Sequence, residues 1–330
     1  MGMFFSLFVV ALLVVVAFAG AQLASLQLLF GVVVPYAALI VFIIGVIIKV
    51  RSWGSSPVPF RIPTTCGQQK SLPWIKHSCI DNPQTTGGVV LRMLFEVLLF
   101  RSLFRNLKSE VKDGKAVYSS DKLLWLAGLA FHVAFFTVLV RHLRFFTEPV
   151  PAFVNMIDAL DGFAQVGVPH LLITGVLLVA AGAYLLFRRI SVPQVKYISL
   201  PADYFPLFLI IAIGLTGIIM RYFTKVDIVG VKELTMGLVS LKLAVPAGIG
   251  AIFYVHLFLI SVLLAYFPFS KLMHMGGVFL SPTRNLANNN REVRHVNPWD
   301  YPVKVHTYEE YEDEFREKMK SVDLPLDKEE

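Results

Sequence analysis

The stretch His256-Leu-Phe-Leu-Ile-Ser-Val-Leu-Leu-Ala-Tyr-Phe-Pro-Phe-Ser-Lys-Leu-Met-His274 decides the fold, because a histidine stands at each end of a run too apolar for a soluble surface. Eighteen helical residues make five whole turns. If Pro268 only kinks the helix, both imidazoles leave from one face, about 27 Å apart along the axis. A second apolar run carries His132 and His142, about 15 Å apart if helical. Four histidines on two membrane helices are the pattern to explain.

Composition indicates the class of protein. Of the 330 residues, 56% are hydrophobic and 16% are charged, whereas soluble domains average about 25% charged residues. The net charge of +7 comes from basic residues that lie mostly in loops beside apolar runs. There they set orientation and meet anionic headgroups, so we expect membrane lipid and not nucleic acid as the charged partner. The sequence predicts an all-α integral membrane protein.

Six apolar runs predict six membrane-spanning helices. They cover about residues 4–21, 28–50, 123–140, 168–187, 204–223 and 243–269. The first run also resembles a signal-peptide core, with Ala17-Phe18-Ala19 as a candidate cleavage site. No Lys or Arg precedes it, which favours a retained helix.

The longest polar segment before the tail is predicted to contain an interfacial helix. Between residues 89 and 107, Arg92, Glu96, Arg101 and Arg105 interrupt an otherwise apolar pattern. Burying several charges at mid-bilayer costs several kcal/mol, so this helix is expected to lie at the interface.

The same polar segment carries Cys66 and Cys79, thirteen residues apart. Two cysteines are too few for a disulfide scaffold or a cysteine-ligated iron–sulfur cluster. Free thiols in a reducing compartment are favoured over one disulfide or a metal site.

The polar C-terminal tail has one helical pattern. Tyr308, Tyr311, Phe315 and Met319 recur at helical spacing among acidic residues. This favours either a partner-docking helix or a solvated helix on a disordered tail.

The basic residues predict the orientation. Residues 49–122 and 188–202 are rich in Lys and Arg, whereas residues 145–167 have none and carry Glu148, Asp158 and Asp161. The loop 221–246 has four basic residues and is a weak exception to this orientation. We therefore expect a multi-pass protein of the inner (cytoplasmic) membrane with both termini in the cytoplasm.

The histidines predict two haem sites. The helices that carry them run in opposite directions, so His132 should lie level with His274, and His142 with His256. A zinc site needs further ligands, and these spans offer no Cys, Asp or Glu at either level. A haem needs one imidazole on each face. Two stacked bis-histidine haems would form an electron path; a proton relay or structural histidines are the alternatives.

At this point the residues carry a family resemblance. The two histidine spacings and the ending Phe-Pro-Phe-Ser-Lys-Leu-Met-His at residues 267–274 resemble the gamma subunit family of respiratory nitrate reductase, a five-helix dihaem cytochrome b that oxidises quinol. Four loop motifs resemble more specifically the DsrM family, membrane cytochrome subunits of the DsrMKJOP complex of dissimilatory sulfur metabolism. They are Pro-Thr-Thr-Cys-Gly-Gln-Gln-Lys-Ser-Leu-Pro-Trp at 63–74, Glu-Val-Leu-Leu-Phe-Arg-Ser at 96–102, Ser-Pro-Thr-Arg-Asn at 281–285 and His-Val-Asn-Pro-Trp at 295–299. The extra first helix suits the six-span family.

The resemblance implies an inner haem b on His132 and His274 and an outer haem b on His142 and His256. It further implies menaquinone exchange near the outer haem, a cytoplasmic iron–sulfur partner similar to the catalytic subunit of heterodisulfide reductase, and other membrane and periplasmic subunits.

On this basis the chain divides into four parts. Residues 1–50 are two N-terminal transmembrane helices, and residues 51–121 are a cytoplasmic loop with the cysteine segment and the interfacial helix. Residues 122–270 form a four-helix dihaem core, and residues 271–330 are a cytoplasmic tail for partner docking.

The outer rim offers candidate proton acceptors for quinol oxidation. These are Glu148, Asp158, Asp161 and His170, with Arg141 and Arg144 able to meet haem propionates. We favour His170, which follows Pro169 at the start of the fourth span and should enter the membrane; for each candidate, a solvated loop charge is the alternative.

The predicted function is electron exchange between the menaquinone pool and the cytoplasmic iron–sulfur partner. A membrane transporter and a structural anchor without haem are the competing classes. The spans show no obvious inverted repeat, which speaks against a transporter.

Overall fold

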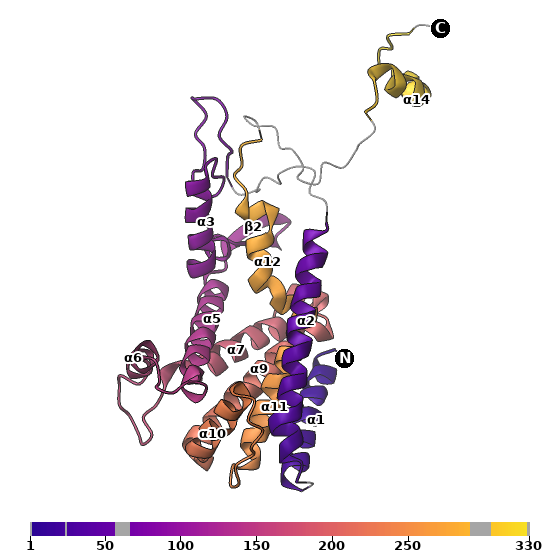
Figure 1. Cartoon of the computed structure of the whole chain (residues 1–330). Helices are drawn as coiled ribbons and strands as arrows, with labels where there is room; N and C mark the ends of the chain where they lie inside the picture. The colour runs from indigo at the N-terminus through magenta and orange to yellow at the C-terminus, as the bar shows by residue number, and fades with distance from the viewer. Residues whose placement is uncertain (1, 24, 57–66, 291–304, 329–330) are drawn as a thin grey trace.

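The structure, a computed structural model, describes residues 2–23, 25–56, 67–290 and 305–328. It is mostly helical (Figure 1). Within these ranges, six helices are long and apolar enough to cross a membrane, which confirms the predicted number of spans. They are α1 (Gly2–Gln22), α2 (Val34–Gly54) with its leading turn Leu29–Val33, α5 (Lys122–His142) running on to Phe145, α7 (Ile173–Ser191), α9 (Pro201–Ile219) running on to Thr224, and α11 (Ala251–Tyr266) running on to Phe269.

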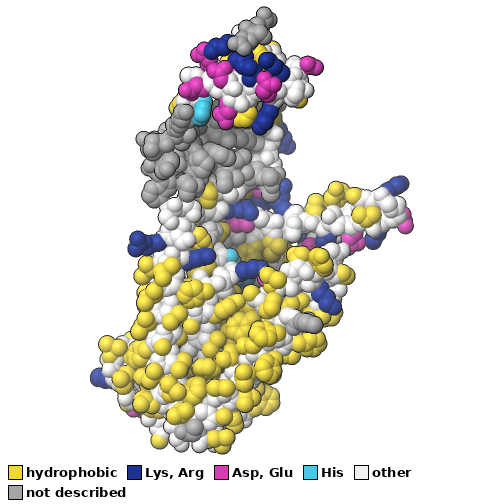
Figure 2. All heavy atoms as spheres, turned by 90° about the vertical axis from the view of Figure 1, so that its right-hand side faces the viewer, with side chains coloured by type: hydrophobic (Ala, Val, Ile, Leu, Met, Phe, Trp, Pro, Cys, Tyr) yellow, Lys and Arg dark blue, Asp and Glu magenta, His cyan; other side chains and the backbone are white. Residues whose placement is uncertain are grey.

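The lengths and surfaces of these helices suit a bilayer. The 21 residues of α1 span about 31 Å, the thickness of the hydrocarbon core. Phe4 and Phe8 on α1 are 68% and 64% exposed. Hydrophobic side chains cover most of the body in Figure 2, whereas charged side chains gather toward one end. An apolar surface of this extent indicates a multi-pass membrane protein.

The order of helix packing leaves α5 and α11 apart. Helix α5 packs on α7, α7 on α9, and α9 on both α1 and α11, while α2 packs on α11. One buried cluster joins α1, α9 and α11 around Leu209 and Leu259, and a second joins α5, α7 and α9 around Ala134 and Ile210. Among the described residues, α5 and α11 make no extensive backbone contact with each other.

The sixth span is not one kinked helix, contrary to the expectation that it would continue from His256 to His274. Helix α11 ends at Tyr266, and two 3₁₀ turns follow, Phe267–Phe269 and Lys271–Met273. Pro268 donates no backbone hydrogen bond, and Ser270 between the turns is extended (φ −119°, ψ 175°). His274 begins a separate helix, α12 (His274–Leu280).

Two other predicted boundaries were wrong. The fourth span begins at Ile173 and not at residue 168, so His170 lies in the turn before α7 and not inside the span. The sixth begins at Ala251 and not at residue 243. Two short helices, α6 (Ala152–Asp161) and α10 (Ile228–Val239), occupy the connections before α7 and α11.

The predicted helix from 89 to 107 is shorter, and the all-α prediction missed a hairpin. Helix α3 (Thr86–Leu99) ends at Phe100, which is left-handed (φ 50°), and the short α4 (Arg101–Phe104) follows. Strands β1 (Leu107–Lys112) and β2 (Lys115–Ser120) then pair antiparallel. Their two-residue turn, Asp113-Gly114, has positive φ at both residues (52° and 74°), as a type I′ turn requires.

Short helices complete the described chain: α8 (Pro193–Ile198), α13 (Pro282–Asn285) and α14 (Tyr308–Ser321). The tail helix expected around residues 308–319 is therefore present, and its docking role stays a prediction. Cys66, residues 63–65 and the motif at 295–299 lie outside the described residues. Cys79 is a free, exposed thiol.

Candidate functional site

The inner pair of histidines meets across the space between α5 and the segment after α11. His132 lies near the middle of α5, and His274 is the first residue of α12. Their ring centres are 6.0 Å apart, and the ring planes are nearly perpendicular, at 82°. Phe100 and Phe131 pack edge-on against His132, with ring centres at 4.9 and 5.3 Å.

The outer pair lies at the C-terminal end of α5. His142 is the last residue of that helix, and His256 is buried in the second turn of α11. Their ring centres are 6.4 Å apart and the planes differ by 21°. The structure thus brings together the two pairs expected from the antiparallel helices; their role as ligands stays a prediction.

All four imidazoles are held through the same nitrogen. Nδ1 lies 2.8 Å from Gly128 O in His132, 2.6 Å from Val138 O in His142, 2.8 Å from Lys271 O in His274 and 2.8 Å from Thr216 Oγ1 in His256. A carbonyl only accepts, so Nδ1–H must donate in the first three. Thr216 has carbonyl acceptors at 2.9 Å for its own proton, Ala212 O and Ile213 O, so its oxygen is free to accept from His256. In each ring this tautomer leaves the Nε2 lone pair for a metal.

The geometry fits a metal held between two imidazoles. Two imidazole nitrogens that bind the same metal ion from opposite sides, each at about 2 Å, lie about 4 Å apart. The centres of their rings then lie about 6 Å apart. The separations of 6.0 and 6.4 Å match this value. In the part of the chain that the structure describes, no three His, Cys, Asp or Glu side chains gather as a metal-binding group. Each pair therefore offers two nitrogen ligands, as a haem iron needs, and not the four ligands of a structural zinc.

Basic side chains lie beside the inner pair. A pocket of about 260 Å³ is lined by His274 together with Arg188, Arg189 and Lys271. Arg188 pairs with Asp121, and Lys271 with a buried aspartate of α9. Cations in this position suit the propionate carboxylates of a haem.

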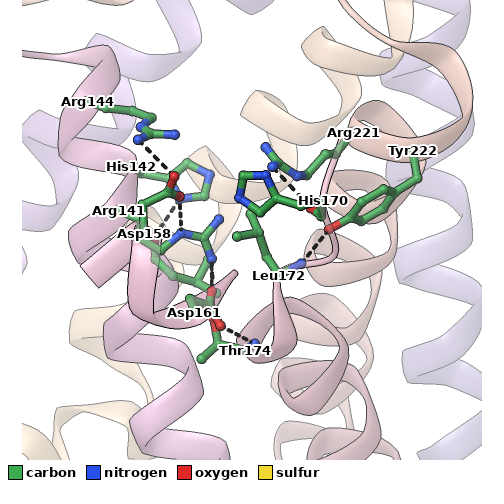
Figure 3. A network of polar contacts seen from close by, with 11 residues as sticks. Arg141, His142, Arg144, Asp158, Asp161, His170, Leu172, Thr174, Arg221 and Tyr222 are labelled. Atoms are coloured by element: carbon green, nitrogen blue, oxygen red, sulfur yellow. Dashed lines mark hydrogen bonds and ion pairs between the residues drawn. The ribbon is translucent and has the colours of Figure 1, made fainter. Parts of the chain in front are cut away.

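The outer rim is a network of charges around α6 (Figure 3). The guanidinium of Arg141 forms ion pairs with Asp158 and with the buried Asp161. Asp161 also accepts hydrogen bonds from Thr174 N at 2.7 Å and Thr174 Oγ1 at 2.6 Å, in the first turn of α7. Arg144 pairs with Asp158 at 3.3 Å. Asp161 therefore ties α5 to α7 and is fully engaged in structure.

A pocket lies beside this network. About 620 Å³ in volume, it is lined by Asp158, Gly162 and His170 among others. The ring of His170 lies so close to Gly162 that a Cβ there would come within 2.5 Å of Nε2. Of the outer-rim candidates, Asp158 and His170 line this pocket, whereas Glu148 pairs elsewhere, with Lys232.

Sequence reasoning missed the contacts that cross between elements. Arg141 and Arg144, expected to meet propionates, each have a carboxylate partner. Arg221 Nη2 donates to His170 O at 3.4 Å, and the Tyr222 hydroxyl accepts from Leu172 N at 2.9 Å, so α9 holds the turn that carries His170 (Figure 3). One partner could have been predicted from sequence: Thr216 is a hydroxyl within an apolar span, and it is the hydrogen-bond partner of His256.

Comparison with known proteins agrees with this arrangement. Residues 90–295 match the nitrate reductase gamma subunit family. The chain is 47% identical to the Hdr-like menaquinol oxidoreductase cytochrome b-like subunit of Archaeoglobus fulgidus, over 82% of this chain and 83% of that protein. It is 42% identical to the protein of the same name from Archaeoglobus profundus, over 81% of each chain. The chain belongs to the nitrate reductase gamma subunit family.

Proposed function

We propose that this chain is a dihaem membrane cytochrome b that exchanges electrons between the menaquinone pool and a cytoplasmic, heterodisulfide-reductase-like iron–sulfur subunit. The observation that carries the proposal is the two close pairs of imidazoles, one near the middle of α5 and one at its C-terminal end, each at a separation that suits one iron. The names of the two relatives, Hdr-like menaquinol oxidoreductase cytochrome b-like subunits, support it.

The chain's own residues would do three things for the two haems. His132 and His274 would bind the inner iron, and His142 and His256 the outer iron. The Nδ1 hydrogen bonds would fix each ring and raise its basicity. The apolar side chains packed between α5, α7 and α9 would exclude water from the macrocycles. Bound haem supplies reversible one-electron chemistry. The two histidines of α5 are ten positions apart, which separates the two levels by about 15 Å along the helix.

Quinol exchange is assigned to the pocket beside the outer pair. Oxidation of menaquinol releases two electrons and two protons, and the protons need an acceptor at the pocket wall. His170 would accept a proton on its imidazole; Arg221 donates to the backbone carbonyl of His170, and Gly162 leaves room for the imidazole ring. Asp158, also in the wall, is paired with Arg141 and Arg144.

The partners follow from the proposed orientation. With both termini in the cytoplasm of a cell with an inner membrane, the cysteine loop and the tail face one side and would dock the iron–sulfur subunit. Membership of the DsrM family, and with it a DsrMKJOP-type complex of dissimilatory sulfite and sulfate metabolism with further membrane and periplasmic subunits, belongs to the same proposal and is supported by the loop motifs.

Purified full-length protein tests the proposal. A dithionite-reduced minus oxidised spectrum should show b-type bands, and a pyridine haemochrome assay should give two haems per chain. His132→Ala and His142→Ala should each lose one of the two. His306→Ala, which alters an exposed side chain on the tail, is the matched control and should lose none. Colourless wild-type protein from haem-replete cells, or a second haem retained in both α5 variants, would contradict the proposal.

A further inference from the structure

His274 is not carried by the helix that carries His256, so its position depends on other contacts. The chain unwinds after Tyr266, and His274 begins a helix of only seven residues. Lys271, three residues earlier, pairs with Asp203 at 2.7 Å. Beyond His274, Gly277 lies against the ring of Trp53, where a Cβ would be 3.5 Å from it. What holds the far end of this segment is a buried arginine on α3.

Arg92 binds the backbone of that far end. It is 3% exposed. Its Nη2 donates to Thr283 O at 2.8 Å and also to Arg284 O, while Nη1 donates to Asp81 O at 3.1 Å. The planar guanidinium presents its donors in a fixed fork. One side chain of α3 therefore fixes α13 and the loop before α3 at the same time.

A second set of contacts locks α13 to the junction of α3 and α4. The carboxylate of Glu96 accepts from Ser102 N at 3.1 Å and from Ser102 Oγ at 2.7 Å. Arg284 donates to Ser102 Oγ at 2.8 Å and lies 3.8 Å from Glu96. These are the residues of two of the loop motifs, and no role in haem or quinone binding accounts for them.

The same arm also contacts the other half of the inner pair. Phe100, between α3 and α4, packs edge-on against His132, with ring centres 4.9 Å apart. Leu99 O accepts from Trp125 Nε1 at 2.8 Å, which fastens the arm to α5. The α3–α4 arm is thus fixed to α5 beside His132 and to α13 beyond His274.

We infer that Arg92 is a positioning residue for the inner histidine pair: through the carbonyls of Thr283 and Arg284 it sets where His274 stands relative to His132. This inference rests on the proposed function, because it concerns the iron that the pair would hold. It assigns no contact between Arg92 and the haem. The outer pair has no such dependence, since His142 and His256 both stand on long membrane helices.

The test is low-temperature electron paramagnetic resonance of oxidised full-length protein, with the His132→Ala and His142→Ala variants used to assign the two signals. Arg92→Ala should shift or abolish the inner signal and leave the outer signal in place. Arg92→Lys keeps the charge but not the fork, and should restore part of the inner signal. Arg105→Ala is the matched control: Arg105 pairs with Asp81 in the same cluster but does not touch α13, so both signals should stay unchanged.

The possible outcomes separate the two claims. Wild-type protein without haem overturns the proposed function itself. If the wild type shows both signals, two outcomes for Arg92→Ala overturn the positioning role alone. Either both signals stay unaltered, or both are lost together. If Arg92→Ala does not accumulate, Glu96→Gln weakens the link to Arg284 with an isosteric side chain. It should then shift the inner signal only, and an unshifted inner signal in that variant counts equally against the inference.

Discussion

The imidazole rings of His142 and His256 lie nearly parallel, with 21° between their planes, at a centre-to-centre distance of 6.4 Å. The rings of His132 and His274 are almost as close, at 6.0 Å, but cross at 82°. The two pairs therefore offer an iron the same donor atoms in different orientations. Parallel axial planes split two of the iron d orbitals, whereas perpendicular planes leave them nearly equal in energy.

This difference predicts two distinct ferric spectra. The inner, perpendicular pair should give a strongly anisotropic low-spin signal, and the outer, parallel pair a rhombic one with a smaller largest g value. Low-temperature electron paramagnetic resonance of wild type and of His142→Ala, which should retain only the inner signal, measures both. Two superimposable signals would show that the rings do not keep these angles around iron.

Thr216→Val should weaken the outer site selectively. Valine keeps the shape of threonine but removes the oxygen that accepts from His256 Nδ1 at 2.8 Å. Loss of such an outer hydrogen bond typically costs about 10–100-fold in metal affinity. Haem retention on dilution and a redox titration should show faster loss of the outer haem or a shifted outer potential. Thr224→Val, on an exposed turn of the same span, should change neither; equal behaviour of the two variants would contradict the prediction.

Asp161→Asn should destabilise the fold. Asp161 is 6% exposed, and its carboxylate holds Arg141 together with the first turn of α7. Removing one partner of a buried pair costs about 3–5 kcal/mol. Thermal unfolding in detergent should show a large drop in midpoint. In the control Glu148→Gln the side chain is 59% exposed, and its pair with Lys232 should contribute at most about 1 kcal/mol. A drop no larger than the control's would argue against this role.

His170→Ala should slow electron entry without loss of haem. The pocket beside α6 would lose its imidazole proton acceptor, and removal of a general base typically costs about 10²–10⁴-fold. Stopped-flow reduction of the haems by a menaquinol analogue measures the rate, and the haemochrome assay checks the content. Glu148→Gln alters an outer-rim candidate that lies outside the pocket, so this variant should keep the wild-type rate. Unchanged kinetics in His170→Ala would remove the residue from the quinone site.

Asp81 should make stability depend on acid pH. Burial raises the pKa of its carboxyl, but hydrogen bonds from Arg105, Arg101 and Ser78 outweigh burial and hold the pKa below its ordinary value of 3.8. A lowered folded-state pKa contributes stability above pH 3.8, and this contribution is lost as the pH falls through the folded-state pKa. Unfolding midpoints between pH 3 and pH 6 should therefore fall less steeply for Asp81→Asn than for wild type. Asp113→Asn, at the exposed hairpin turn, should follow the wild-type curve; parallel curves for all three would contradict the prediction.

The features that came from apolar runs were predictable, because every membrane span must satisfy its own backbone and exclude charge. The same constraint allowed the depth of each histidine in the membrane to be predicted. The structure brings together the two pairs expected from opposite helix directions. Boundaries were less accurate where apolar residues continue into a turn. Val168 and Leu172 extend the fourth run in sequence, yet the helix starts only at Ile173.

Tertiary contacts explain what the sequence did not reveal. Whether Pro268 kinks or ends a helix depends on tertiary contacts such as the ion pair of Lys271 with Asp203 of α9. The Asp113-Gly114 dipeptide was a clear local signal for a hairpin, which the all-α prediction did not use. The pairing of Arg141 with Asp161 joins residues on different helices, and no periodicity within one segment reports it.

The hydrogen bonds to the four imidazole rings differ in whether an amino-acid substitution can remove them. Three of the imidazoles donate to main-chain carbonyls of their own turn, Gly128, Val138 and Lys271, and no amino-acid replacement can delete a carbonyl. Of the four rings, only that of His256 donates to a side chain, the hydroxyl of Thr216 on a neighbouring helix. If the four rings bind haem as proposed, a substitution of Thr216 would alter the hydrogen bond of one outer ligand, whereas no substitution can remove the carbonyls that the other three rings bind.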